Sequence, residues 1–279
     1  MRLLPFLLIL FATVMAGAAS AQENMPWSRG GRVPDASVRL EAQDLADRLG
    51  LACRVGRAEA RGIDADRMPQ FEVTCAEGAG YLLIDGVRPR AVDCLSLEAS
   101  RVASDGRTQA CRIAANRDPV PVIAPLAREA GIVCRVDAGA LRGRTPTGAT
   151  LYEVGCAGED GFWLEQAATG WTVTACMKAA ARGGDCRFTT PGEQGATVRR
   201  WLAGNEAAGC DVVEARFMGE GREAQAGTEL YEARCRSGGG WLIRAASEPD
   251  GLPKRVVAVY PCIGAAHIGG GCRLSGATP

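Results

Sequence analysis

The chain has 279 residues, and its 32 basic side chains balance its 32 acidic ones, so the formal net charge is zero. A nucleic-acid-binding protein needs a basic face, and this balance argues against that class. Twelve cysteines, an even number, in a chain with few aromatic residues predict a fold that depends on disulfides.

The N-terminal segment, residues 1–21, has the pattern of a secretory signal peptide. Arg2 supplies the positive start, residues 3–16 form an almost unbroken apolar run, and Ala19-Ser20-Ala21 is a small-x-small cleavage site. The run is shorter than the roughly 20 apolar residues that a membrane span needs, and no later segment qualifies. We therefore expect cleavage near Ala21-Gln22, a flexible segment over 22–34, and a periplasmic or secreted mature protein without a stable membrane span.

The cysteines fall into three sets of four that share their spacing and their neighbours. First and second cysteines are 22, 22 and 25 residues apart, and each fourth cysteine is followed by Arg and an apolar residue. Self-similarity of this kind is typical of tandem repeats. We predict three modules, over 35–116, 117–190 and 191–279. Their cysteines are Cys53, Cys75, Cys94 and Cys111; Cys134, Cys156, Cys176 and Cys186; and Cys210, Cys235, Cys262 and Cys272.

Each module is expected to open with a helix. Apolar periodicity ends at Gly in the first two copies, as is usual at a helix C-terminus. The expected boundaries are Pro34-Asp35 or Ser37 to Gly50; Asp118-Pro119 to Gly131, with Pro121 and Pro125 delaying regular helix; and about Pro191 to near Ala208.

Four strands are expected after each helix. In QFEVTC, Phe71, Val73 and Cys75 alternate with Glu72 and Thr74, which predicts a strand with one apolar face. A hairpin brings the first cysteine opposite the second. A Gly-aromatic pair then begins a third strand, which turns into a fourth that ends near the third cysteine. A short helix or loop and a last short strand are expected before the fourth cysteine.

Four cysteines in a module allow three disulfide pairings. The hairpin favours the first with the second, which leaves the third with the fourth. A closed loop of about 20 residues contributes roughly 3 kcal/mol of stability in the chain-entropy model. The predicted fold class is therefore α+β: three tandem modules, each with one helix packed on a small antiparallel sheet and two intramodule disulfides.

This order of elements, with LYEVGC, a Gly turn and Ala168-Thr169-Gly170-Trp171, resembles the PepSY-like modules of exported bacterial proteins. It is also similar to the beta-lactamase inhibitor proteins, in which a helix on an antiparallel sheet is repeated in tandem. The two cysteine pairs in each copy depart from the PepSY pattern. The resemblance implies a binding or inhibitory module rather than an enzyme, and it carries over no functional residue.

Metal and redox sites are not expected. Zinc sites and thiol–disulfide exchange both favour the C-x-x-C pattern, with cysteines three positions apart, and the tightest spacings here are ten positions, Cys176 to Cys186 and Cys262 to Cys272. The glycine runs lack the spacing of phosphate-binding loops. We therefore predict no cofactor and no metal.

No catalytic constellation is predicted either. The single histidine, His267, occurs in one copy only, and we expect an incidental loop position for it. Glu72, Glu153 and Glu232 recur in all copies on the strand face opposite the cysteines. We expect them to point to water, with a contact surface for a partner as the alternative.

A cross-strand charge pair is expected in the third copy, where Asp211 should stand nearly opposite Arg234.

Aromatic residues at strand starts supply the candidate partner contacts. Phe162 and Trp163 are adjacent and cannot point to one face of a strand, so one should be exposed or covered by a neighbouring module. With Trp241 they are the possible partner contacts. The predicted function is a non-enzymatic binding or inhibitory protein that acts on another envelope or extracellular protein, whose identity the sequence does not specify. The alternatives are a hydrolase or other small-molecule enzyme with a site between modules, and a structural envelope component.

Overall fold

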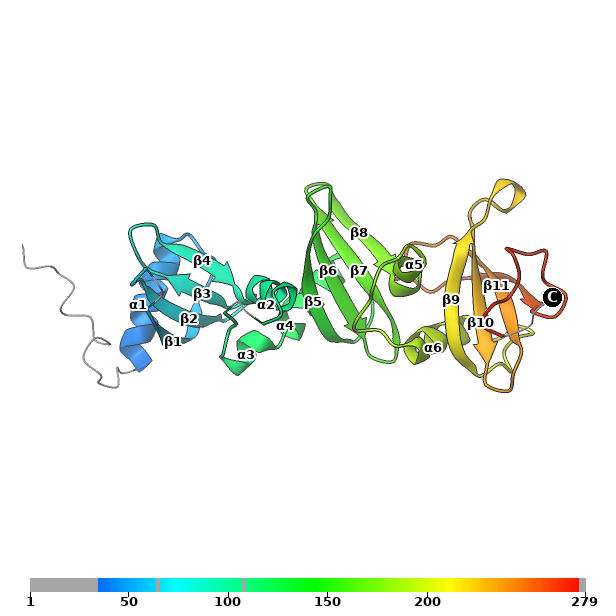
Figure 1. Cartoon of the computed structure of the whole chain (residues 1–279), viewed down its shortest axis with the longest axis horizontal. Helices are drawn as coiled ribbons and strands as arrows, with labels where there is room; N and C mark the ends of the chain where they lie inside the picture. The colour runs from blue at the N-terminus through cyan, green and yellow to red at the C-terminus, as the bar shows by residue number, and fades with distance from the viewer. Residues whose placement is uncertain (1–34, 64–65, 107–108, 276–279) are drawn as a thin grey trace, which may run out of the picture.

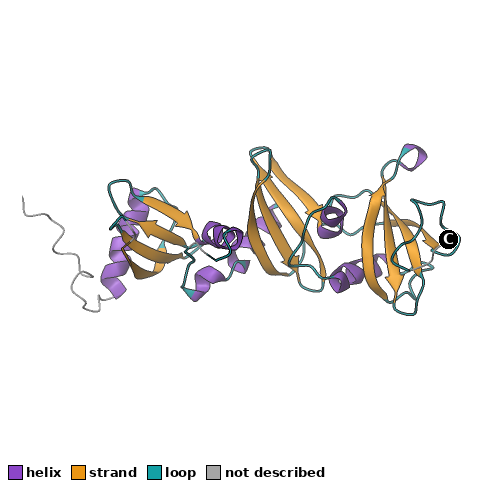
Figure 2. Ribbon diagram, in the orientation of Figure 1, coloured by secondary structure: helices purple, strands orange, loops and turns teal. Residues whose placement is uncertain are grey.

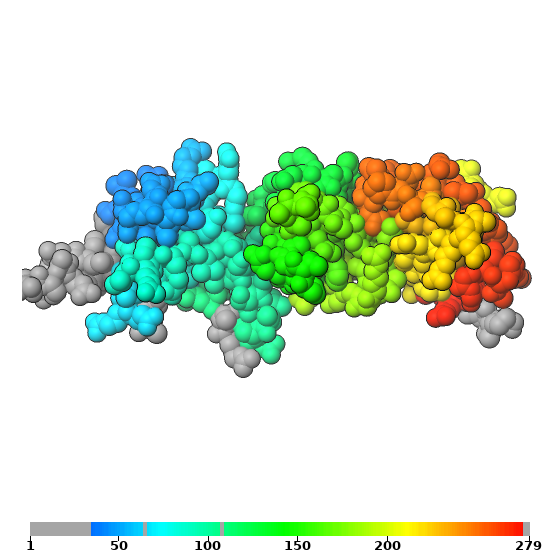
Figure 3. All heavy atoms as spheres, turned by 90° about the horizontal axis from the view of Figure 1, so that it is seen from above, coloured from blue at the N-terminus to red at the C-terminus, as the bar shows by residue number. Residues whose placement is uncertain are grey.

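The computed structural model describes residues 35–63, 66–106 and 109–275. The predicted signal peptide and the segment 22–34 lie outside these residues. The described chain is elongated, with three sheets in chain order along its long axis and helices between them (Figure 1, Figure 3). This confirms a mixed helix and sheet fold.

Each sheet has four antiparallel strands in the order of the sequence (Figure 2). The sheets share one register at the hairpin: Val55 pairs with Cys75, Val136 with Cys156, and Val212 with Cys235. The first sheet contains β1 (Val55–Ile63), β2 (Pro69–Cys75), β3 (Tyr81–Ile84) and β4 (Arg90–Asp93). The second contains β5 (Val136–Arg144), β6 (Thr150–Cys156), β7 (Glu159–Ala167) and β8 (Gly170–Ala175), and the third β9 (Val212–Glu220), β10 (Thr228–Cys235), β11 (Gly240–Ala246) and β12 (Val256–Pro261).

The described residues also form helices. They are α1 (Asp35–Arg48), α2 (Cys94–Ala103), α3 (Ala114–Arg117), α4 (Val120–Glu129), α5 (Cys176–Ala181), α6 (Pro191–Leu202) and the short 3-10 turn η2 (Glu223–Gln225). α1 contacts β1, whereas α2 and α4 both contact β5. α5 and α6 contact β7 of the second sheet and β9 of the third, so they form a shared layer between two sheets. None of the helices in the described part of the chain has the length and apolar character to cross a membrane.

Helix boundaries follow local signals with two differences from expectation. α6 starts at Pro191, as predicted, and Thr190 and Glu193 form a capping box at this end. α6 ends at Leu202 rather than near Ala208. The expected proline delay in α4 is wrong, because the helix begins at Val120 and contains Pro125.

The apolar face of β2 packs on the helix that precedes the first sheet. In the first sheet, Phe71 and Val73 are buried against Val38 and Leu45 of α1. The face opposite the helix is also covered. The segment that carries the third and fourth cysteines packs on it. In the third sheet, for example, Leu230 and Leu242 of that face pack on Ala265.

Six disulfides join the cysteines in the predicted pairing. They are Cys53–Cys75, Cys94–Cys111, Cys134–Cys156, Cys176–Cys186, Cys210–Cys235 and Cys262–Cys272. The short strand expected between each third and fourth cysteine does not form in the described residues. α2, α5 or turns occupy that part of the chain.

Candidate functional site

The recurring glutamates are buried, so the expectation that they point to water is wrong. Glu72, Glu153 and Glu232 are each 0% exposed. They do lie on the strand face opposite the helix-facing apolar residues, as predicted. That face is closed because the chain folds back over it some 40 residues later.

In the first sheet the Glu72 carboxylate is held by four groups. Arg61 forms an ion pair with it, and the backbone N–H of Arg112 donates to both oxygens at 2.8 and 2.7 Å. The N–H of Ile113 donates at 2.7 Å and the Asn116 amide at 3.0 Å. A buried charge is tolerated only when it is paired and hydrogen-bonded, and this one is both.

The second and third sheets repeat the arrangement. We call the buried glutamate, its arginine and the two backbone N–H groups after the fourth cysteine the glutamate clamp. In the second sheet Glu153 pairs with Arg142 and accepts N–H donors from Arg187 and Phe188, the latter at 2.8 Å. In the third, Glu232 pairs with Arg216 at 2.7 Å and accepts from Arg273 and Leu274, both at 2.6 Å.

The clamp accounts for a repeat that sequence analysis recorded without a role. The residues after each fourth cysteine, Cys-Arg-apolar, supply the two N–H donors. Arg61 and Arg142 also occupy equivalent places, each 11 residues before its glutamate. In the third sheet Arg216 is displaced from that place and stands directly opposite Glu232.

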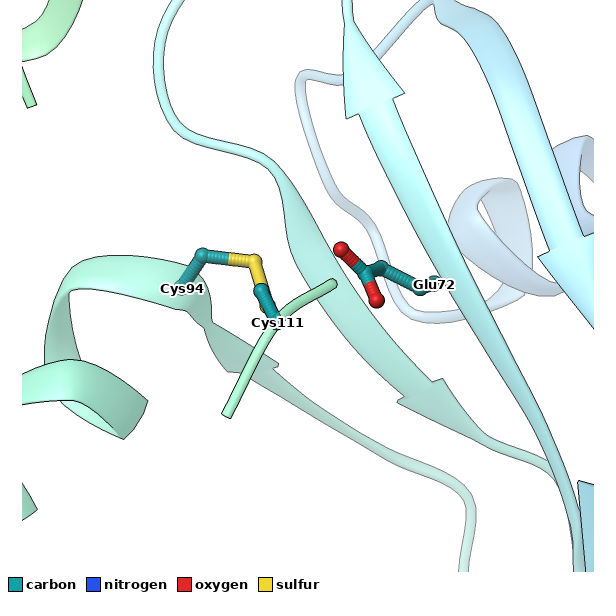
Figure 4. Close-up of side chains that lie close together, drawn as sticks. All are labelled: Glu72, Cys94 and Cys111. Carbon is teal, nitrogen blue, oxygen red and sulfur yellow. A yellow bond between two sulfur atoms is a disulfide. The ribbon is translucent and has the colours of Figure 1, made fainter. Parts of the chain in front are cut away.

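Two of the clamps lie beside a disulfide. The carboxylate oxygen of Glu72 and the sulfur atoms of Cys94 and Cys111 lie within 4.8 Å of one another (Figure 4). Glu232, Cys262 and Cys272 form a second group of this kind. The sulfur atoms are bonded to each other and the carboxylate is occupied by the clamp, so neither group offers a thiolate to a metal ion.

The predicted pair of Asp211 with Arg234 does not form. Arg234 pairs with Glu214 at 2.9 Å, and Asp211 pairs with Arg236 at 2.7 Å. The cause is a register shift between Arg234 and Cys235, which places Glu214 opposite Arg234.

The structure brings together Lys178 and Lys254, the two lysines of the chain. Lys178 on α5 lies 2.7 Å from Glu229 on β10 and 2.7 Å from Asp250. Lys254 lies 3.1 Å from Glu229 and 3.2 Å from Asp250. The Tyr231 hydroxyl donates to Glu229 at 2.6 Å. We call these five residues the lysine cluster.

The lysine cluster holds its charges in the interior. Burial opposes charge on Lys178, but Asp250 and Glu229 outweigh it and raise the pKa of the ammonium group. Burial likewise opposes charge on Glu229, but Lys178 and the Tyr231 hydroxyl outweigh it and hold the pKa of this carboxyl below its ordinary value. Burial and the bond to Glu229 raise the pKa of Tyr231. The cluster therefore joins the second and third sheets through compensated charges rather than through a reactive amine.

A cleft of about 480 Å³ lies beside the lysine cluster, between the second and third sheets. Its volume falls within the range of small-ligand sites. Residues of both sheets and of α6 line it, among them Asp160, Phe162, Trp201, Tyr231 and Lys254. A larger cleft of about 640 Å³ lies between the first and second sheets, next to α2 and β5.

Asp160 is the unusual residue of the smaller cleft. It is 3% exposed, its Oδ2 accepts the N–H of Met177 at 3.2 Å, and its Oδ1 has no hydrogen-bond partner. Burial raises the pKa of this carboxyl to about 7, although the Met177 N–H and the Gln194 amide oppose the rise. No motif pointed to Asp160, because its partners lie on α5 and α6, where Met177 donates to its carboxyl group and Thr197 accepts its N–H.

The other predicted site residues have different surroundings. Phe162 is half-buried and lines the cleft. Trp163 points to the opposite face of β7, as expected, and packs against Gly184 after α5. Trp241 is half-buried against the core of the third sheet. His267 is exposed in the C-terminal turns and does not line the cleft.

Comparison with protein-family models, curated proteins and solved structures found no match for this chain.

Proposed function

We propose that the chain is a non-enzymatic binding protein of the periplasm or cell exterior, and that it binds another protein at the cleft between its second and third sheets. The observation that carries this proposal is the cleft itself, where aromatic side chains lie beside the buried carboxyl group of Asp160, one oxygen of which has no hydrogen-bond partner, at the junction of two sheets. Six disulfides favour an oxidising compartment.

Repetition supports the same function. Among the residues that recur in the three copies are the cysteines, the glutamates and the Cys-Arg pairs. All of these form disulfides or glutamate clamps within the fold. We infer that one unit, a helix with a four-stranded sheet and two disulfides, was copied twice. The resemblance to PepSY-like and beta-lactamase-inhibitor-like modules points to binding or inhibition as well. In this proposal the clamps maintain shape, and the junctions between sheets supply the binding surface.

Site-specific cross-linking tests the proposal. A photo-reactive residue placed at Val133, which lines the cleft and is 85% exposed, should capture a defined partner from periplasmic extract. The same residue at Val87, which is 92% exposed in the turn between β3 and β4, is the matched control. A partner trapped from Val133 and not from Val87 supports the proposal. Repeated absence of adducts at Val133, or the same adducts at both positions, contradicts it.

The second candidate is a small-molecule enzyme that uses the same cleft. Asp160 favours it, because a carboxyl with a pKa of about 7 suits general acid–base catalysis near neutral pH. The raised pKa values of Lys178 and Tyr231 disfavour it, since they leave both groups protonated and poor nucleophiles. Turnover of ester or amide substrates that Asp160→Asn abolishes would establish the enzyme instead.

A further inference from the structure

We propose that the cleft between the second and third sheets accepts a basic side chain, arginine or lysine, of the partner protein. This inference rests on the proposed binding function and specifies the chemistry of the group that is bound. Four features of the cleft support it: the free carboxylate oxygen of Asp160, the net charge of the lining, the aromatic walls and the apolar rim.

The floor of the cleft carries a carboxylate oxygen without a partner. Asp160 is 3% exposed and lines the cleft. Its Oδ2 accepts the N–H of Met177 and the Gln194 amide also acts on the carboxyl group, but its Oδ1 has no hydrogen-bond partner. Buried carboxylate oxygens are normally satisfied, and one that is not marks a place where a donor fits. A guanidinium or ammonium group is the strongest such donor.

The charge of the lining is complementary to one cation. Glu159, Asp160 and Asp250 face Arg200 and Lys254. The Arg200–Glu159 pair is closed at 2.5 Å and the Lys254–Asp250 pair at 3.2 Å. Lys178 and Glu229 balance each other behind the cleft. When Asp160 is ionised, its negative charge has no positive partner among the residues named above.

The walls suit a planar or alkyl cation. Phe162, Trp201 and Tyr231 line the cleft, and the Trp201 and Tyr231 rings lie edge to face with centroids 5.1 Å apart. Aromatic faces attract guanidinium and ammonium groups, and the attraction is larger when the cation is desolvated.

The rim explains why we assign the cation to a protein rather than to a free amine. Val133 is 85% exposed and Leu252 is 47% exposed, and both line the cleft mouth. Val133 precedes the second sheet, whereas Leu252 belongs to the third. Both present apolar surface that the residues on either side of the basic residue in the partner chain would cover. A basic side chain flanked by apolar residues fits this arrangement.

Binding of short peptides to the full mature chain tests the inference. The probes are acetyl-Leu-Xaa-Leu-amide peptides with Xaa as Arg, Lys or Gln, together with agmatine, and the readout is NMR titration that includes the Trp201 indole signal. We expect the Arg and Lys peptides to bind at least about tenfold more tightly than the neutral Gln peptide. Asp160→Asn should remove this preference, and Asp137→Asn, an exposed carboxylate of β5, should keep it. Leu252→Ser should weaken the binding of all three peptides to a similar extent.

Several outcomes would overturn the inference. They are equal binding of the Arg and Gln peptides, a charge preference that survives Asp160→Asn, and no binding at millimolar concentration, which would leave an ordered water as the occupant. Agmatine binding as tightly as the Arg peptide would contradict the assignment to a protein side chain. Should Val133 cross-link a partner while the peptides show no charge preference, this inference fails and the binding function stands. Should the peptides discriminate while Val133 traps nothing, the proposed function fails and the cleft chemistry stands.

Discussion

The ammonium group of Lys178 lies 2.7 Å from the carboxylate of Glu229, although 51 residues separate them along the chain. Both side chains are buried, and they belong to elements associated with different sheets. Because a buried charge is costly without its partner, this contact ties the second sheet to the third more strongly than an exposed pair could.

The lysine cluster predicts a large stability loss on removal of one cation. In Lys254→Met, Glu229 and Asp250 share the single remaining lysine, and we expect a loss of about 3 kcal/mol or more. Arg255→Met, an exposed neighbour, is the control and should change stability by about 0.5 kcal/mol or less. Urea unfolding monitored by tryptophan fluorescence measures both. Equal midpoints for the two variants would rule out a structural role for the cluster.

The three glutamate clamps predict a graded series. Each Glu→Gln change leaves an arginine without its countercharge, and the arginines differ in side-chain exposure: Arg61 3%, Arg142 15% and Arg216 30%. We therefore expect Glu72→Gln to cost the most, about 3–5 kcal/mol, Glu153→Gln less, and Glu232→Gln the least.

Hydrogen exchange resolved by sheet is the suitable measurement for this series, because the three sheets need not unfold together. Glu77→Gln, on an exposed turn of the first sheet, is the control. The reverse order, or equal costs, would show that burial of the arginine does not set the energy of the clamp.

The disulfide next to a clamp should matter more than its loop length suggests. In the chain-entropy model, Cys53–Cys75 and Cys94–Cys111 each contribute about 3 kcal/mol, with the longer first loop slightly ahead. Loss of Cys94–Cys111 also frees the N–H donors of Arg112 and Ile113 from Glu72. We expect the double alanine variant of that pair to lose roughly 1–3 kcal/mol more than the variant of the first pair. Chemical denaturation compares the two, and a larger loss for Cys53–Cys75 would contradict the expectation.

The buried Asp160 carboxyl group predicts that the stability difference between the natural protein and the Asp160→Asn variant depends on pH. Its folded pKa of about 7 lies above the ordinary value of 3.8, so the folded state binds a proton that the unfolded state releases between these values. Folding stability from this group is therefore present at low pH and lost as pH rises toward and through 7. Asp160→Asn removes this pH-dependent loss of folding stability, which is on the order of 4 kcal/mol at most.

The measurement is the unfolding free energy of both proteins at several pH values. Asp160→Asn should exceed the natural protein in stability at pH 8, and the difference should shrink as the pH falls toward the unfolded value. Asp137→Asn should show no such trend, because its side chain is exposed. A difference that is constant with pH would mean that Asp160 does not titrate as described.

Local information in the chain was sufficient for the opening helices, the four strands of each sheet and the disulfides, but not for the segments between third and fourth cysteines. Alternation of Phe71, Glu72 and Val73 defines a strand with two distinct faces, and the hairpin places Cys53 beside Cys75. Both depend on neighbours that are close in sequence, where spacing constrains geometry. The same reasoning placed Phe162 and Trp163 on opposite faces of one strand.

Tertiary structure decided what covers each face. Alternation shows that Glu72 and Val73 point in opposite directions, but it cannot show that residues 112 and 113 return to close the far face over Glu72. Lys178, Glu229 and Lys254 carry no shared motif, and Asp160 is an ordinary strand residue in the sequence, whereas in the fold it contacts Met177 of α5 and Thr197 of α6. Charges are read from the sequence as solvated by default; whether they are buried depends on contacts between distant segments, which only the folded chain brings together.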